Sequence, residues 1–175
     1  PPESCRVLEL GCASGGNLIP MAWRLPGSYF LGVDLSARQI KDGRALIERL
    51  GIDNIELRQG DILDLELEAR SFDYIIAHGI YSWVPEAVRA RLLALAARSL
   101  APNGLLYLSY NVLPGWRLRG TLRDILLDAC REEPHPPLRL GLAYAALHRL
   151  DTALSGLEAL SARLLRVEIA RVQAA

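Results

Sequence analysis

The stretch VLELGCASGG, residues 7–16, decides the fold of this chain. It begins with apolar residues of the kind that form a buried strand, and it runs into a turn that contains Gly11, Gly15 and Gly16. Glycine permits unusual backbone dihedrals and lets a ligand approach the main chain. Because a helix that starts after such a turn presents unpaired amide groups, the stretch predicts a strand, a ligand-binding turn and a helix in succession.

Outside this stretch, short apolar runs alternate with amphipathic helical patterns over the first two thirds of the chain. This alternation is typical of a parallel sheet covered on both faces. It predicts an α/β fold, a Rossmann-like doubly wound parallel sheet of about five strands followed by a helical C-terminal segment. The strands are expected at Arg6–Leu10, Tyr29–Asp34, Ile55–Gln59, Tyr74–Ala77 and Leu105–Tyr110.

The helices between these strands are marked by their end residues. A first helix is expected from near Asn17 to just before Pro26. Ser36 followed by Gln39 forms a capping-box pattern, and Gly51 stands where a left-handed residue ends a helix, so a second helix is expected from Ser36 to Leu50. The remaining connections are a short acidic stretch at Asp61–Arg70, a helix that begins at Pro85, and a turn at Asn103–Gly104.

After Tyr110 no strand pattern follows, and helical patterns are broken by a proline cluster at 134–137. We therefore expect a core domain over residues 1–116 and a helical extension over residues 117–175. Leucines recur every seven residues in the extension, at Leu140, Leu147 and Leu154 and at Leu150, Leu157 and Leu164. So short a seam is more typical of packing within the chain than of a coiled coil, and an oligomer formed through it is the alternative.

The composition limits the class of protein. Twenty basic side chains balance twenty acidic ones, so no global charge favours nucleic acid or an anionic membrane. The three cysteines do not have metal-ligand spacing, and neither a disulfide framework nor a metal site is expected. Without a signal-peptide or transmembrane pattern, a cytoplasmic protein is expected. A core strand lies close to Pro1 and the last residues follow a helical pattern, so the chain is expected to be part of a longer protein.

Three carboxylates lie at the ends of successive predicted strands: Glu9 and Asp34 within the last residues of their strands, and Asp61 just after the third. In an open parallel sheet, ligands bind beyond the carboxyl ends of the strands. Asp34 lies at the separation from the turn at which an acidic residue accepts ribose hydroxyls. Asp61 could accept from an adenine amino group while Ile62 packs on the ring. Each acid taken alone is equally well explained as a solvated loop residue or a helix cap.

Two nucleotide cofactors fit such a pattern, NAD and S-adenosylmethionine. A pyrophosphate would meet an unfavourable charge at Glu9, whereas S-adenosylmethionine presents an ammonium and a sulfonium with only one carboxylate. The dinucleotide fingerprint is also imperfect, because Ala13 stands at its middle glycine, between Gly11 and Gly16. The charges favour the methyl donor, and an NAD-dependent oxidoreductase stays as the second interpretation.

Five motifs together resemble the ordered motifs of class I S-adenosylmethionine-dependent methyltransferases. They are VLELGCASGGN, GVDLS, GDILDL, FDYIIAHGIYSWVP and LAPNGLLYLSYN, within about the first 110 residues. HGIYSWVP and YNVLPGWRLRGTLRDIL further resemble bacterial methyltransferases that carry a methyltransferase regulatory domain downstream. Some proteins of that kind methylate protein lysines. The sequence departs from the family at Ala13, where glycine is commoner, and lacks the last two strands of the usual seven-stranded sheet.

The resemblance implies a donor site and a methyl acceptor, either a protein or a small molecule. The donor-site residues that it implies are Glu9, Gly11, Cys12, Ala13, Ser14, Gly15, Asp34, Leu35, Asp61, Ile62 and His78.

The candidate catalytic residues are His78, Tyr81 and Asn111. His78 could orient or deprotonate the acceptor, or simply satisfy a backbone carbonyl. Tyr81, Trp83, Tyr110 and Trp116 could form an acceptor wall, although packing alone would also explain them. The first hypothesis is methyl transfer to a nitrogen or oxygen nucleophile, with a protein lysine considered ahead of a small metabolite as the acceptor. A scaffold that binds S-adenosylmethionine without catalysis is the remaining alternative.

Overall fold

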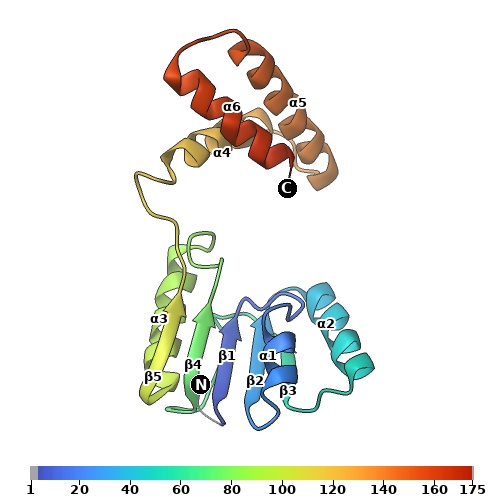
Figure 1. Ribbon diagram of the computed structural model, residues 1–175, viewed down its shortest axis with the longest axis vertical. Coiled ribbons are helices and arrows are strands. Elements are labelled where there is room, and N and C mark those ends of the chain that lie inside the picture. Colours follow the sequence, from blue (N-terminus) through green and yellow to red (C-terminus); the bar gives the residue numbers. More distant parts are fainter. Residues whose placement is uncertain (1–3, 175) are drawn as a thin grey trace. The chain divides into compact units, whose positions relative to one another are not determined.

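The computed structural model describes residues 4–174. The chain divides into two compact units, one that ends at Tyr110 and one that begins at Asn111, and each is described by itself. The first unit is an α/β sandwich and the second is made of helices (Figure 1). Between residues 4 and 174, no helix combines the length and apolar character that a membrane crossing requires.

The first unit is built on a parallel sheet with the strand order β3-β2-β1-β4-β5. The chain winds from the central strand β1 outward through β2 and β3, and then returns to the other side of β1 to form β4 and β5. The direction of winding therefore reverses between β1 and β4, which is where ligands bind in folds of this kind. This confirms the doubly wound sheet predicted from the sequence. The strands are β1 (Arg6–Leu10), β2 (Tyr29–Asp34), β3 (Ile55–Gln59), β4 (Phe72–Ala77) and β5 (Leu100–Leu108).

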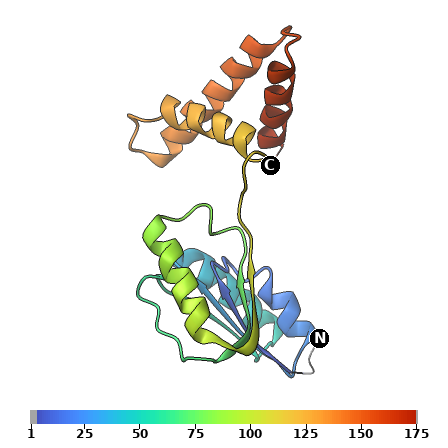
Figure 2. The same cartoon turned by 90° about the vertical axis from the view of Figure 1, so that its left-hand side faces the viewer.

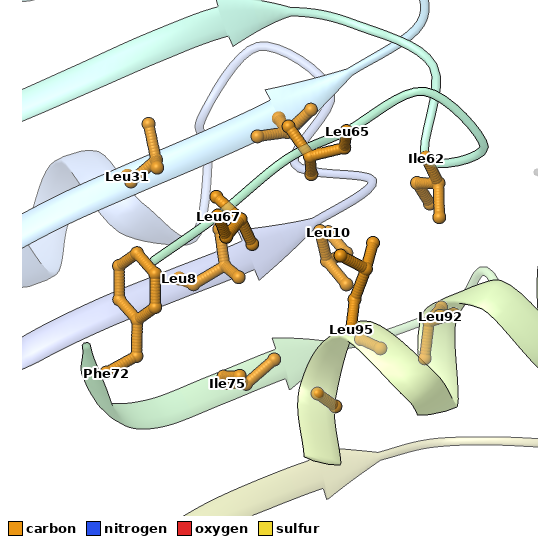
Figure 3. Packing of buried hydrophobic residues seen from close by; sticks show 13 residues of the cluster. Leu8, Leu10, Leu31, Ile62, Leu65, Leu67, Phe72, Ile75, Leu92 and Leu95 are labelled. Carbon is orange, nitrogen blue, oxygen red and sulfur yellow. The ribbon is translucent and has the colours of Figure 1, made fainter. Parts of the chain in front are cut away.

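Helices cover the two faces of this sheet (Figure 2). On one face α1 (Leu18–Arg24) and α2 (Ala37–Leu50) pack on β1, β2 and β3 through a core cluster that includes Phe30 and Leu57. On the other face α3 (Glu86–Ser99) packs through Leu92 and Leu95 onto residues of β1, β2 and β4 (Figure 3). Because side chains alternate along a strand, Leu8 and Leu10 face α3, while Glu9 between them faces α1.

The predicted caps of α2 are present. The hydroxyl of Ser36 accepts a hydrogen bond of 3.4 Å from the amide of Gln39, and Gly51 ends the helix with a φ of +64°. The buried face of α2 holds Ile40 and Ile47. These features fix where α2 begins relative to the end of β2, and both segments contribute residues to the candidate site.

Two strands differ from the sequence prediction. β4 begins at Phe72 rather than Tyr74, and β5 begins at Leu100, so that Asn103 and Gly104 lie inside a strand and not in a turn before it. The pairing of the two strands is irregular between Phe72 and Tyr74. A side chain at Gly104 would lie 3.0 Å from main-chain oxygens of β4, so glycine permits this close approach.

The second unit contains α4 (Arg117–Ala129), α5 (Pro136–Leu154) and α6 (Leu160–Gln173). Its core is small, with Leu122, Leu147 and Ile169 buried and Leu150 and Leu154 packed against them. The leucine seam is thus divided: its middle packs within the unit, and the left-handed Gly156 interrupts it. Leu140, Leu157 and Leu164 are exposed.

Candidate functional site

The turn after β1 is fastened to the end of β2. The amides of Gly11 and Cys12 both donate to the carbonyl of Val33, at 2.8 and 3.1 Å. Three turn residues have left-handed backbones: Gly11 at φ +77°, Ala13 at +51° and Gly15 at +79°. Gly16, singled out from the sequence, has no such φ and lies in open space. The first three positions therefore shape the turn, and glycine is not required at the fourth.

Asp34, at the end of β2, holds this turn from the other side. One carboxylate oxygen accepts the amide of Ala13 at 2.9 Å, and the other accepts the amide of Ser36 at 2.9 Å. The side chain therefore joins the turn to the start of α2. Since a carboxylate has about four acceptor sites, each oxygen keeps capacity for a ligand hydroxyl.

Glu9 carries a buried carboxylate directly beneath the turn. Its side chain faces α1, where Oε1 accepts a hydrogen bond of 3.0 Å from the side-chain amide of Asn17. Oε2 is buried and has no hydrogen-bond partner within residues 4–174. Burial raises the pKa of Glu9, opposed by the Asn17 hydrogen bond and by the charge of His78. A buried acceptor without a partner is costly, and a cationic or N–H-donating ligand would satisfy it.

Two further glycines, not recognised as site residues from the sequence, allow the turn to pack. A side-chain carbon at Gly43, in the middle of α2, would lie 2.5 Å from the carbonyl oxygen of Ser14. One at Gly32 would lie 2.7 Å from the sulfur of Cys12, which is buried against β2. Burial raises the pKa of the Cys12 thiol to about 12, so it stays protonated. The only sequence signal was glycine inside a predicted helix and a predicted strand.

The end of β3 supplies the third predicted carboxylate. Asp61 accepts the amide of Leu63 at 2.9 Å, which closes a local turn. Ile62, expected to pack on an adenine ring, is 7% exposed and belongs to the core cluster under α3 (Figure 3). Leu35, next to Asp34, is 67% exposed and offers a larger apolar surface at this edge.

The loop after β4, residues 78–81, lies between the end of β5 and the turn after β1, residues 11–15, which is called the donor turn below. A side-chain carbon at Gly11 would lie 2.8 Å from Cδ1 of Ile80, so the loop packs directly on the turn. The His78 ring lies 5.8 Å from that of Tyr107. The Tyr81 ring makes an edge contact with Tyr110 at 6.2 Å.

Arg89, in the first turns of α3, adds a cation to this loop. Its guanidinium lies 6.0 Å from the centre of the Tyr81 ring. A ring that holds a guanidinium in this way is also suited to another cation. The side chain of Tyr81 is half-buried, whereas His78 is exposed.

A cleft of about 590 Å³ opens on the α1 face of the sheet beside these groups. Its lining includes the polar side chains of Asn17 and His78 and the larger apolar surfaces of Met21, Tyr74, Leu105 and Tyr107. The partner of Glu9 and the exposed histidine thus share one cleft.

The structure brings most of the predicted site residues together at the carboxyl edge of the sheet. The donor-site candidates lie at or just after the ends of the first four strands: Glu9 and 11–15 at β1, Asp34 and Leu35 at β2, Asp61 and Ile62 after β3, and His78 after β4. Asn111 and Trp116 lie in the second unit, where the guanidinium of Arg119 lies 5.4 Å from the Trp116 ring centre. Within the described part of the chain, no three His, Cys, Asp or Glu side chains are grouped to hold a metal ion.

Comparisons with known proteins bear on this edge of the sheet. A family model described as a methyltransferase domain matches residues 7–104, more than half of the chain. An uncharacterized protein of Rickettsia prowazekii is 47% identical over 125 residues, which cover 71% of this chain and 23% of that protein. Trans-aconitate 2-methyltransferase of Deinococcus radiodurans is 33% identical over 104 residues, which cover 58% of this chain and 36% of that enzyme.

A solved structure is similar over both units. PKMT2 from Rickettsia typhi, in complex with AdoHcy, matches with a TM-score of 0.78 and 36% identity, and the match covers 99% of this chain and 33% of that one. The chain therefore spans between 23% and 36% of the length of these three proteins.

Proposed function

This chain belongs to the class I S-adenosylmethionine-dependent methyltransferases, and from that premise we propose that it transfers a methyl group to a nitrogen or oxygen nucleophile. The amine of a protein lysine is the first candidate for the acceptor. The observation that carries the proposal is the buried carboxylate of Glu9, whose Oε2 lacks a partner in the described residues. The ammonium group of the donor would satisfy it.

The other residues at this edge fit the remaining parts of the donor. Asp34 would accept the ribose hydroxyls with the acceptor capacity that its two backbone hydrogen bonds leave. The exposed Leu35 would cover the adenine, and Asp61 would accept from its amino group. NAD fits less well, because its pyrophosphate would lie at the turn after β1, beside the carboxylate of Glu9, whereas Asp34 could serve the ribose of either cofactor.

The bound donor supplies a methyl group that its sulfonium already activates. The protein must then align the acceptor and exclude water. The loop of residues 78–81 would do so, with Tyr81 and Tyr110 as the wall of the acceptor site. His78 would orient the nucleophile or take its proton. Asn111 stays a prediction as a further orienting residue.

A protein lysine is favoured by two observations. The Tyr81 ring already lies close to a guanidinium, which is consistent with an aromatic site for a cationic side chain. The chain is similar over both units to PKMT2, and its motifs resemble bacterial enzymes of which some methylate lysines. Reaction requires the neutral amine, so the site would bind the cation first and release its proton before transfer.

The proposal is tested by ligand-induced stabilisation. S-adenosylhomocysteine should raise the free energy of unfolding with the logarithm of its concentration, by about 2.7 kcal/mol at a hundredfold excess over its Kd. NAD at the same concentration should have no such effect. The reverse pattern would contradict the proposed cofactor site.

Transfer itself is measured on the full-length protein. It should pass label from methyl-labelled donor to lysine residues of a protein substrate mixture, and chemical blocking of the lysines should abolish the labelling. Binding of the donor without any transfer would instead support a scaffold.

A further inference from the structure

β5 and the two residues that follow it contact the loop of residues 78–81 at three points. The Tyr107 ring lies near His78, and the Tyr110 ring lies against Tyr81. Between them, the hydroxyl of Ser109 accepts a hydrogen bond of 2.8 Å from the amide of Gly79. Of these three contacts, the hydrogen bond to Ser109 is the one that holds the main chain of the loop directly.

The conformation of Gly79 explains why this hydrogen bond matters. Gly79 has a left-handed backbone, with φ +69°, so the chain turns sharply after His78. Its amide lies beyond the end of β4, where the regular pairing of the sheet has stopped. A backbone donor needs an acceptor, and Ser109 supplies it. Ser109 is itself held in register, because its amide donates to the carbonyl of Ala77 at 3.2 Å.

The loop also contacts the donor turn on its other side. Ile80 packs against Gly11, so a shift of the loop would move Ile80 on the turn. A small displacement at Gly79 would therefore change both the turn that faces the donor and the ring that faces the acceptor. Misplacement of reacting groups by about 1 Å can reduce the rate of a reaction by about a hundredfold.

We propose that Ser109 is a positioning residue: its hydroxyl sets the place of residues 78–81 between the donor turn and the acceptor wall. The inference rests on the proposed function. Ser109 touches neither donor nor acceptor in this role, and it acts through Gly79. Its effect should therefore fall on transfer, while binding of the donor product depends on Glu9 and Asp34.

The test compares Ser109→Ala with Ser109→Thr in the full-length protein. The alanine variant should lose about fivefold in kcat/KM for the acceptor, the factor expected for one lost hydrogen bond. Hydrogen exchange of the amides at 79–81 should become faster by a similar factor. The threonine variant keeps a hydroxyl and should restore both values. The affinity for S-adenosylhomocysteine should change less than twofold in both variants.

Ser155→Ala provides the matched control, since that hydroxyl donates to a carbonyl in the second unit. It should change neither the exchange at 79–81 nor the acceptor kinetics. The inference is overturned if Ser109→Ala leaves exchange and kinetics unchanged, or if threonine restores neither. If the wild-type protein transfers no methyl group, the proposed function fails. The role of Ser109 in holding the loop is then decided by the exchange at 79–81 alone.

Discussion

The carboxylate of Asp34 accepts a hydrogen bond of 2.9 Å from the main-chain amide of Ala13, so the last residue of β2 holds the turn that follows β1. Its second oxygen accepts the amide of Ser36 at the start of α2. One side chain therefore sets the relative positions of the two segments that would face the ribose. Asp34 is therefore expected to contribute both to donor binding and to the stability of the fold.

Replacement of Asp34 by alanine should reduce both stability and donor binding. Loss of two hydrogen bonds to a charged acceptor should lower the free energy of unfolding by about 1–3 kcal/mol. The affinity for S-adenosylhomocysteine should fall at least about tenfold, because the ribose acceptor is lost as well. Urea denaturation and titration calorimetry measure the two effects. Asp64→Ala, at an exposed acid after β3, is the control, and unchanged affinity in Asp34→Ala would refute the assignment.

Ala13→Gly should stabilise the protein. Ala13 has a φ of +51°, a conformation that costs an L-residue with a side chain about 1–2 kcal/mol. The greater freedom of glycine in the unfolded chain offsets about 0.4–1 kcal/mol of that. We expect urea denaturation to show a net gain of up to about 1.6 kcal/mol in the free energy of unfolding. Ala94→Gly, at an exposed position in the interior of helix α3, should be destabilising by about 1 kcal/mol. A loss of stability in Ala13→Gly would contradict the strain at this turn.

Much of the first unit could be predicted from sequence, because its elements are specified locally. The strands β1, β2 and β3 begin and end where the apolar runs do, and α2 is marked by Ser36 and Gly51. The boundaries of β5 could not be predicted. The pairing with β4 extends the strand back through Asn103 and Gly104, residues whose local preference is a turn.

The three carboxylates of the candidate site were predicted from their places at strand ends, whereas their hydrogen-bond partners were not predicted. That Asp34 would accept the amide of Ala13, or that Gly43 would lie against Ser14, depends on contacts between segments distant in sequence. Ser109 was missed for the same reason, since a single serine at a strand end has no distinguishing pattern. Ile62 was expected to face the ligand, but an apolar residue after a strand can equally pack into the core.

Gly43→Ala should be destabilising although it lies inside a helix. In an open helix position the change from glycine to alanine stabilises by about 0.5–1 kcal/mol. At Gly43 the new carbon would lie 2.5 Å from the carbonyl oxygen of Ser14. Because this oxygen belongs to the main chain, no change of side-chain rotamer can relieve the clash. Overpacking of this kind costs about 1–3 kcal/mol, and displacement of the turn should weaken binding of S-adenosylhomocysteine.

Gly141→Ala is the matched control for that variant, because Gly141 lies in α5 and a side chain there would meet nothing within 4 Å. It should raise the free energy of unfolding. If both variants are stabilising, α2 does not pack on the donor turn as closely as the structure has it.

Glu9 makes stability and donor binding respond to pH in opposite directions. Burial raises the pKa of its carboxyl above the value in the unfolded chain. The folded protein therefore binds this proton more tightly, and the contribution of Glu9 to stability is greatest below the unfolded-state pKa. That contribution is lost as the pH rises through the raised pKa. An ammonium ligand prefers the ionised carboxylate, so donor binding should strengthen over the same range.

Glu9→Gln separates these two effects. The amide keeps an oxygen for Asn17 but cannot ionise, so the variant should gain stability relative to wild type as the pH rises through the raised pKa. Its affinity for S-adenosylhomocysteine at neutral pH should fall about tenfold or more, the effect of losing a hydrogen bond to a charged group. Urea denaturation and calorimetry over a series of pH values measure both. Below the ordinary carboxyl pKa both side chains are neutral, so the two proteins should differ least there. If Glu9→Gln binds as tightly as wild type at neutral pH, the buried Oε2 is not the acceptor for the donor ammonium, because only the ionised carboxylate distinguishes the two proteins.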